Sequence, residues 1–335
     1  MNGVFIIPTG IGCEIGGHAG DATSAAKLVA SVCDKLIIHP NVVNASDINE
    51  MTENMLYVEG STLDKFLEGS INLKLVKSNK ILLVVNAPVT NEIINSVSAA
   101  RATIGADIEI LELNAEDPFH IRAFFNDKGI ADGELFGLDE LINKVNNYKF
   151  DVLTIASKIF VDENVALNYV DNGGVNPWGG AEARVSRVIS ERIGRPTFHS
   201  PFGHTLDNFD EVVDPRMAAE FVSVSYLHCI LKGAHKAPKM THNNIGDLSY
   251  KDIDFMVSPF GCYGKPHRAC FENSIPVIIV KENNTICNYY GLNTIPKGFI
   301  LVENYLEAIG VIQAMKCGIS LESIRRPLSK TKVMR

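Results

Sequence analysis

The sequence lacks several features that would assign it to a familiar class of protein. No apolar run approaches the roughly 20 residues of a membrane-spanning helix. The first ten residues, MNGVFIIPTG, carry no basic segment of the kind that opens a signal peptide. Blocks of lysine and arginine are also missing, and the formal net charge is −8. We therefore expect a cytoplasmic protein that binds neither nucleic acid nor a membrane, and the sequence leaves self-association open.

Paired cysteine motifs are missing as well. The seven cysteines form no C-x-x-C pair, which argues against a thiolate zinc site and against a thioredoxin-type redox motif. Their odd number in a chain of 335 residues indicates free thiols in a reducing compartment. Four of the cysteines lie within helical patterns, where cysteine is usually a small core residue: Cys33, Cys229, Cys270 and Cys317.

Neither common nucleotide-binding fingerprint is complete. The chain has no G-x-x-x-x-G-K-[ST] segment. The segment GIGCEIGG follows an apolar run, but the next helical pattern begins only near Ala25, and no acidic residue follows the second apolar run before Asp47. A dinucleotide site needs the helix to begin beside the glycines. We interpret the segment instead as a long loop that lines a ligand site, and we expect no organic cofactor.

Short runs rich in valine and isoleucine alternate with helical patterns along the whole chain. Strands are predicted at 4–7, 35–40, 55–60, 80–86, 108–114, 151–159, 253–259, 275–283 and 298–304. Helices are predicted at 24–35, 90–104, 136–147, 179–194, 214–236 and 304–319. The alternation predicts an α/β fold of mostly parallel sheet with helices on both faces, arranged as one or two Rossmann-like lobes. A boundary at the polar segment NNYKF would divide the chain into residues 1–149 and 150–335.

Two turns of the sequence share an unusual composition. VFIIPTGIGCEIGGH and FMVSPFGCYGKPH are each an apolar run, a proline, glycines, a cysteine and a histidine five residues later. A helix is predicted to begin near Pro266, and a helix start with nearby basic residues stabilises a thiolate. Such a thiol can act as a nucleophile or transfer a proton. The predicted catalytic residues are Cys262, Cys13, His18 and His267.

Further polar residues are predicted to bind the substrate. The loop after the first strand contributes Thr9, Gly10 and Gly12, and the loop HPNVVNASDINE contributes Asn44 and Asp47. The segment GGVNPWGGAEARVS opens a helix whose free N–H groups favour an anion. From it we select Gly180, Glu182 and Arg184, with the forked side chain of Arg184 as a carboxylate or phosphate clamp. His199 and His204 match no strong metal-binding pattern, so no metal site is predicted.

Two resemblances add to these patterns. Residues 255–267 locally resemble the second-cysteine segment of the cofactor-independent aspartate and glutamate racemases, in which two thiols act as base and acid. Across nearly the whole chain, the sequence resembles the family called domain of unknown function 3326. The segments that carry this resemblance are IPTGIGCEIGGHAGDA, HPNVVNASDINE, LYVEGS, VDPRMAAEFVS and VENYLEAIG. It implies a shared fold, and it carries no assigned activity or catalytic residue.

The leading hypothesis is a cofactor-independent enzyme of the isomerase or lyase type. It would act on a small anionic metabolite that bears a carboxylate, by thiol-assisted proton transfer or by addition and elimination. A first alternative is a transferase that binds a nucleotide or a phosphorylated metabolite in its glycine loops. A second alternative is a metabolite-binding protein without catalytic activity.

Overall fold

The computed structural model describes the chain except for residues 19, 44, 115, 117, 202–225, 243–244, 288–297, 332 and 335. Its largest sheet has six parallel strands in the order β15-β14-β13-β1-β2-β3. These strands are β1 (Asn2–Phe5), β2 (Lys35–Ile38), β3 (Met55–Tyr57), β13 (Phe255–Phe260), β14 (Val277–Asn284) and β15 (Ile300–Val302). The order reverses between β1 and β13, as in a classical doubly wound sheet.

A second parallel sheet, in the order β11-β9-β5-β6, comes from the middle of the chain. Its strands are β5 (Lys80–Asn86), β6 (Asp107–Leu113), β9 (Val152–Ser157) and β11 (Thr197–Pro201). Two smaller sheets, β10-β7-β8 and β12-β4, complete the described strands. They comprise β4 (Asn72–Lys74), β7 (His120–Phe125), β8 (Ala131–Phe136), β10 (Ile159–Phe160) and β12 (Lys239–Thr241).

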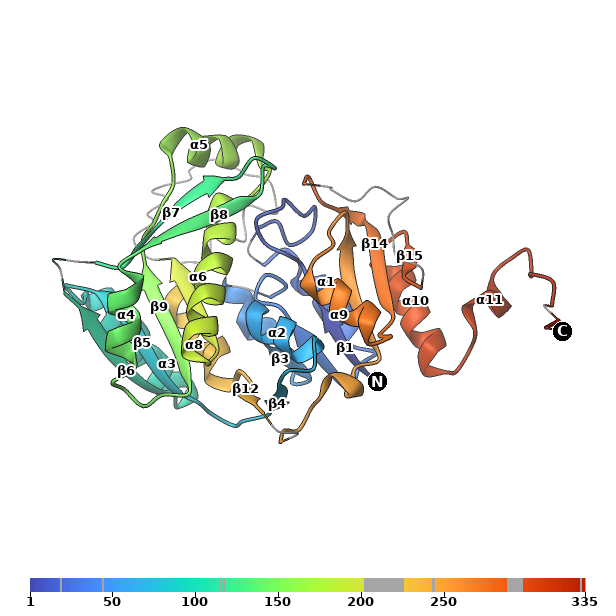
Figure 1. The fold of residues 1–335 in the computed structure, drawn as a ribbon, viewed down its shortest axis with the longest axis horizontal. Helices are drawn as coiled ribbons and strands as arrows, with labels where there is room; N and C mark the ends of the chain where they lie inside the picture. Colours follow the sequence, from blue (N-terminus) through green and yellow to red (C-terminus); the bar gives the residue numbers. More distant parts are fainter. Residues whose placement is uncertain are drawn as a thin grey trace.

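Helices cover both faces of the two large sheets (Figure 1). The longer ones are α1 (Thr23–Ala30), α2 (Gly60–Leu67), α3 (Asn91–Ile104), α4 (Leu138–Val145), α5 (Glu163–Asn172), α6 (Pro177–Ile193), α8 (Tyr226–Lys236), α9 (Lys265–Glu272) and α10 (Tyr305–Lys316). The short ones are η1 (Ala45–Glu50), η2 (Tyr250–Asp252) and α11 (Leu321–Ile324). The segment with α11 extends away from the rest of the molecule (Figure 1).

Alternate residues of each central strand enter different hydrophobic clusters. Phe5 of β1 and Leu83 of β5 share the largest cluster, which lies between the two large sheets and includes α8. Val4 packs with α2 and α9 on the outer face of the first sheet, and Leu82 packs with α6 on the outer face of the second. Because both faces of each strand are apolar and covered, the strands read as continuous apolar runs in the sequence. The α/β prediction is therefore confirmed.

The predicted boundary after residue 149 does not separate the two sheets. The six-stranded sheet combines strands from before residue 58 with strands from after residue 254, and β5 pairs with β9 across residue 150. Chain order alone does not reveal that β13 is placed next to β1. The strands of the second sheet lie between the two sequence segments that build the first.

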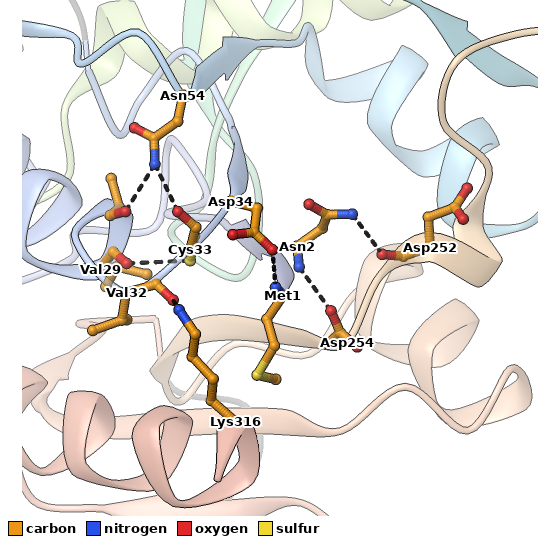
Figure 2. Close-up of polar contacts among 11 residues, drawn as sticks. Met1, Asn2, Val29, Val32, Cys33, Asp34, Asn54, Asp252, Asp254 and Lys316 are labelled. Atoms are coloured by element: carbon orange, nitrogen blue, oxygen red, sulfur yellow. Dashed lines mark hydrogen bonds and ion pairs between the residues drawn. The ribbon is translucent and has the colours of Figure 1, made fainter.

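Polar contacts at the amino-terminal edge of the six-stranded sheet fix β1 in place (Figure 2). The Asn2 backbone N–H donates to Asp254 over 2.7 Å, and the amino group of Met1 pairs with Asp34. The Asn54 amide donates to the carbonyls of Ala30 and Cys33, so Cys33 belongs to this structural edge. The glycine loop after β1 and the turn with Cys262 after β13 lie at the opposite, carboxyl-terminal ends of the same strands.

Candidate active site

The candidate site lies where β1 and β13 end side by side, at the reversal point of the six-stranded sheet. Gly3 of β1 pairs with Phe255 of β13, and Phe5 pairs with Val257. Each strand then leads into a turn that contains a cysteine, Cys13 or Cys262. Ligands of doubly wound sheets bind in the crevice at this point, because the connections on either side run to opposite faces of the sheet.

The glycine loop after β1 is held by an extension of β14. Glu14 donates its backbone N–H to Asn284 (2.9 Å), and Ile286 and Cys287 donate theirs to Gly12 (2.8 Å) and Ile11 (3.1 Å). Cys13 forms a bridge pair with Thr285 at the centre of this short ladder. The fully buried amide of Asn283 adds bonds to both the N–H and the carbonyl of Ile15. The loop that carries Cys13 is therefore fixed by backbone pairing.

Cys13 is a buried thiol in an environment that disfavours its charge. Its side chain is 6% exposed, and its Sγ donates to the Pro8 carbonyl over 3.4 Å. Burial raises the pKa of Cys13 well above its ordinary value, and the nearby groups of Cys262, Asp21 and Cys287 raise it further. At neutral pH Cys13 is a protonated thiol.

Cys262 is only partly buried, and hydrogen-bond donors approach its sulfur. Ser258 Oγ lies 3.3 Å from Cys262 Sγ and 2.7 Å from Nε2 of His267. Nδ1 of His267 accepts the Gly264 backbone N–H over 3.2 Å, so the neutral ring carries its proton on Nε2 and donates to Ser258. The Ser258 hydroxyl proton then has two acceptors within reach, the Cys262 sulfur at 3.3 Å and the Pro259 carbonyl at 3.4 Å.

The two thiols differ in how their charged forms are supported. Burial raises the pKa of Cys262 to about 11, while Ser258 and the backbone N–H of Cys262 lower it. No group that acts on Cys13 lowers its pKa. Burial lowers the pKa of His267 to about 4, so this ring is neutral at pH 7. In its neutral form Cys262 Sγ donates to the Pro259 carbonyl over 3.2 Å, as Cys13 does to Pro8, and only Cys262 also has groups that lower its pKa.

Tyr305 of α10 lies beside both cysteines. Burial raises the pKa of the Tyr305 hydroxyl, and charges on Cys13 and on Cys262 both raise it further, so both sulfurs lie within electrostatic reach of one phenol. The Asn283 amide donates to the Tyr305 oxygen over 2.7 Å, which leaves the hydroxyl proton available to another acceptor. The structure therefore brings Cys13 and Cys262 to one place, as the sequence predicts.

His18 and His267 do not play matching parts, although each follows its cysteine by five residues. Nδ1 of His18 lies 2.6 Å from the hydroxyl of Tyr169 in α5, and the two rings are tilted by 37° with their centroids 5.4 Å apart. His267 caps its own helix through the bond from Gly264 and reaches Cys262 only at 3.9 Å. His267 therefore reaches the Cys262 thiol mainly through Ser258, whose hydroxyl contacts both the ring and the sulfur.

The predicted glycines pack tightly against the protein itself. A Cβ atom on Gly10 would lie 2.9 Å from the Gly180 Cα, and one on Gly180 would lie 2.3 Å from the Ala131 carbonyl oxygen. Gly12 faces the Ile286 side chain, and Thr9 lies near Gly179 at the start of α6. The structure does bring Thr9, Gly10 and Gly180 together. Close packing accounts for the two glycines, so their presence no longer indicates a phosphate cradle.

The remaining predicted binding residues are dispersed. Arg184 is exposed, and its Nε pairs at 3.8 Å with Asp132, so its predicted role as a substrate clamp stays a prediction. Glu182 is partly buried; burial raises the pKa of Tyr57 at the end of β3, and the charge of Glu182 raises it further. Asp47 belongs to η1, where burial raises its pKa, while a contact with Thr23 lowers it. Asn44 lies outside the described residues.

Several residues of the site were missed in the sequence. Ser258 lies within the apolar run FMVSPF, where a single serine does not by itself indicate a functional residue. Cys287 lies close to Cys13, and its Sγ donates to the Gly129 carbonyl over 3.3 Å. Its position shortly after a predicted strand, like that of the other two cysteines, was a usable signal. Asn283 and Tyr305 depend on pairing between distant segments, which the sequence does not show.

Metal ligation finds no support among the described residues. His199 of β11 bonds through Nε2 to Ser157 over 3.0 Å, and His204 lies outside the described part of the chain. No group of three or more His, Cys, Asp or Glu side chains within the described ranges is arranged to hold a metal ion. None of the helices described by the structure is both long enough and apolar enough to span a bilayer.

Comparison with known protein families identifies one family for this chain. The family described as "Protein of unknown function (DUF3326)" matches residues 2–325. An uncharacterised lipoprotein of Synechococcus sp. is 31% identical over 337 residues, which covers 95% of this chain and 92% of the relative. No solved structure matches the chain. The local resemblance to the racemases is not shown by these comparisons and stays a prediction.

Proposed function

This chain belongs to the family of proteins of unknown function DUF3326, and from that premise we propose that it is a cofactor-independent enzyme acting on a small carboxylate-bearing metabolite. The proposed reaction is proton transfer at the carbon next to the carboxylate, as in an isomerase or racemase. The addition–elimination chemistry of a lyase is the nearest variant. We propose a cytoplasmic location for this activity.

One observation carries the proposal. Two thiols, Cys13 and Cys262, follow the adjacent strands β1 and β13 at the reversal point of a doubly wound sheet. The charge of Cys262 raises the pKa of Cys13, and the charges of both cysteines raise the pKa of Tyr305. Buried cysteines are common in protein cores. Two of them at the ligand-binding edge of such a sheet, one with a hydroxyl within hydrogen-bond distance of its sulfur, suit a base and an acid for proton transfer.

The asymmetry of the two environments assigns the roles. Cys262, with hydrogen bonds from Ser258 and its own backbone N–H, is the proposed base in its thiolate form. Cys13, whose surroundings all favour the neutral thiol, is the proposed acid. We assign Ser258 and His267 as positioning residues, because Ser258 contacts the Cys262 sulfur and His267 contacts Ser258.

The proposed reaction consists of two proton transfers at the α-carbon of the substrate. The Cys262 thiolate forms an S–H bond with the proton of the substrate's α-carbon, and the electron pair of the broken C–H bond moves into the carboxylate group. The S–H bond of Cys13 then breaks, its proton adds to the opposite face of the carbon, and the electron pair returns. Cys13 ends as the thiolate and Cys262 as the thiol. The reverse reaction starts from this state.

The order of the six-stranded sheet also favours the nucleotide-binding alternative, because dinucleotides bind at the same reversal point. Against it, a Cβ atom on Gly10 would lie 2.9 Å from both the Ala131 carbonyl oxygen and the Gly180 Cα, so close packing already accounts for this glycine. A thermal-shift series separates the two. Stabilisation by nucleotides supports the alternative, and stabilisation by small carboxylic acids supports our proposal.

The name of the Synechococcus relative raises the question of lipid attachment. A lipoprotein is acylated on a cysteine that becomes its first residue after cleavage. Cys13 is the first cysteine here, and cleavage before it would remove β1, a central strand of the six-stranded sheet. We therefore propose that Cys13 is not lipidated. Intact mass measurement of protein expressed in a cyanobacterium tests this, and an acylated Cys13 at the amino terminus would refute it.

Substitution of the proposed base tests the function. Once a screen of 2-amino and 2-hydroxy acids identifies a converted substrate, Cys262→Ala and Cys262→Ser should each abolish conversion. Cys270→Ala is the matched control, because Cys270 is a fully buried thiol whose Sγ contacts Met256 on the outer face of the sheet. Retained conversion in both Cys262 variants would refute the mechanism. Tight binding without conversion by the wild type would favour the non-catalytic alternative.

A further inference from the structure

The small sheet of β10, β7 and β8 has one covered face and one open face. On the covered face, Ile121 and Ile159 are buried in the hydrophobic cluster that includes α6. Gly133 also faces this helix, because a Cβ atom on it would lie 3.1 Å from the Ala181 Cα. Figure 1 shows the β7–β8 hairpin beside α6. Since side chains alternate between the two faces of a strand, the outer face consists of His120, Arg122, Phe124, Asp132, Glu134, Phe136 and Phe160.

Aromatic rings dominate this outer face, where strands with one buried face usually carry polar side chains. Phe124 is 45% exposed and Phe160 is 47% exposed. The His120 ring stacks on Phe136 with centroids 4.6 Å apart, and it lies edge-to-face with Phe160 at 5.6 Å. The rings therefore form a continuous row across all three strands. An exposed apolar patch of this kind, with charges around it, is typical of a surface that contacts another protein.

The charges on the outer face are separated by strand. The cations Lys158 and Arg122 belong to the side of β10 and β7, and the carboxylates Asp132 and Glu134 belong to β8. The ammonium of Lys158 lies 5.0 Å from the centre of the Phe160 ring. Phe160 pairs with Arg122 and Arg122 pairs with Glu134, so this ammonium is level with Glu134 along the strands.

The ion pairs within the chain leave charge on this face open to a partner. Arg122 pairs with Glu134 across the hairpin, but their side chains are 65% and 48% exposed. Asp132 pairs with Arg184 only at 3.8 Å. Exposed pairs of this kind contribute little to stability. Lys158 forms no ion pair within the part of the chain that the structure describes.

A second copy of the chain fits this pattern of charge. A twofold axis along β7, between two facing copies of the sheet, places β10 of each copy over β8 of the other. Residues keep their level along the strands under this rotation, so Lys158 of one copy meets Glu134 of the other. Phe160 of one copy then packs near Phe136 of the other, and Phe124 lies near the axis. Two sheets pack face to face in this way at a separation of about 10 Å.

The acidic side of the face argues against nucleic acid as the partner. Single-stranded nucleic acid also stacks on aromatic side chains. Asp132 and Glu134 place carboxylates on this face, where they would repel phosphates, and the chain carries a net charge of −8. A surface with both signs of charge on opposite sides matches a copy of itself better than it matches a polyanion.

We propose that two copies of the chain associate through this outer face as a twofold-symmetric homodimer. The sheet has three strands of at most six residues, so the contact measures about 14 Å by 20 Å. A contact of this size is small for a protein interface, so the dimer is weak and reversible. Salt weakens it further, because the charges that meet are exposed in the single chain.

Sedimentation equilibrium of the full chain at increasing protein concentration tests the proposal. Wild type should form dimers. Phe160→Ser should weaken the dimer roughly tenfold or more, because the interface contains this ring twice. Phe271→Ser is the matched control, since Phe271 of α9 is 54% exposed and lies outside the small sheet. This variant should dimerise like wild type.

Charge exchange tests the orientation of the two copies. Lys158→Glu and Glu134→Lys should each weaken the dimer about fivefold or more, because each places like charges opposite one another. Lys158→Glu/Glu134→Lys should recover part of the lost affinity, because the pairs form again with their signs exchanged. No recovery in this double variant would refute the twofold axis along β7.

Three results would overturn the proposal as a whole. The first is a wild type that stays monomeric at every concentration. The second is a dimer that Phe160→Ser leaves unchanged. The third is a monomer that binds a single-stranded oligonucleotide and loses this binding in Phe160→Ser, which would assign the aromatic row to nucleic acid.

Discussion

Ser258 Oγ lies 3.3 Å from Cys262 Sγ, on the strand that ends just before this cysteine. The serine receives a hydrogen bond from His267, whose orientation is set by the Gly264 backbone N–H. The chain of donors therefore begins at the backbone of a helix start and ends at a sulfur. A hydroxyl held in this way stabilises a thiolate without supplying a charge.

Ser258→Ala should reduce the reactivity of Cys262. Loss of one hydrogen bond worth about 1 kcal/mol lowers the thiolate population and slows alkylation roughly fivefold at a given pH. The control is Ser157→Ala, which removes the hydroxyl partner of another buried histidine, His199, in the second sheet. Mass spectrometry of iodoacetamide-treated protein measures the rate. Equal slowing in both variants would show a general loss of stability instead.

The alkylation of Cys262 should depend steeply on pH. Burial raises its pKa to about 11, so the thiolate fraction rises about tenfold per pH unit from pH 7 to about pH 10. The exposed Cys317 serves as an internal reference and should be alkylated first at pH 7. A rate at Cys262 that levels off below about pH 9 would contradict a raised pKa for this thiol.

Acid should weaken the fold through His267. Its folded-state pKa of about 4 lies below the ordinary value of 6.5, so its contribution to stability is complete above pH 6.5 and is lost as the pH falls toward 4. Between pH 7 and pH 5 this one group should cost about 2 kcal/mol of unfolding free energy. Urea unfolding of wild type and His267→Ala measures the difference. An equal pH dependence in both proteins would exclude the effect.

Two glycine substitutions should have opposite signs. Gly180→Ala would place a Cβ 2.3 Å from the Ala131 carbonyl oxygen and should destabilise the protein by about 1–3 kcal/mol through overpacking. Gly310→Ala, inside α10 with nothing within 4 Å of its added Cβ, should stabilise it by about 0.5–1 kcal/mol. Thermal unfolding compares them. A tolerated Gly180→Ala would mean that α6 does not pack on β8 as described.

The sequence predicts the central strands well because their burial is complete. The predicted strand at 80–86 coincides with β5, and the helix predicted at 90–104 begins one residue later, at Asn91 of α3. The hairpin of β7 and β8 was missed, because its strands carry polar and exposed residues and give no continuous apolar run. Part of the helix predicted at 214–236 lies outside the described residues, which begin α8 at Tyr226.

The candidate site was predictable only where its residues end a strand. Cys13 and Cys262 follow apolar runs, and parallel strands meet at one edge, so their convergence follows from the fold class. The partners of these residues come from long-range packing. His18 contacts Tyr169, 151 residues away, and Arg187 rather than Arg184 turns toward α2. No periodicity within one segment identifies the helix that will pack against it.

Exchange of the substrate's α-proton with solvent tests the central claim most directly. With a converted acid in D2O, the wild type should incorporate deuterium during inversion at the α-carbon, since Cys262 and Cys13 serve opposite faces. Cys13→Ala should still exchange the one enantiomer whose proton faces Cys262, without forming the other, and Cys262→Ala should lose exchange of that enantiomer. Wild-type exchange and inversion in both variants, followed by NMR and chiral chromatography, would contradict the two-thiol mechanism.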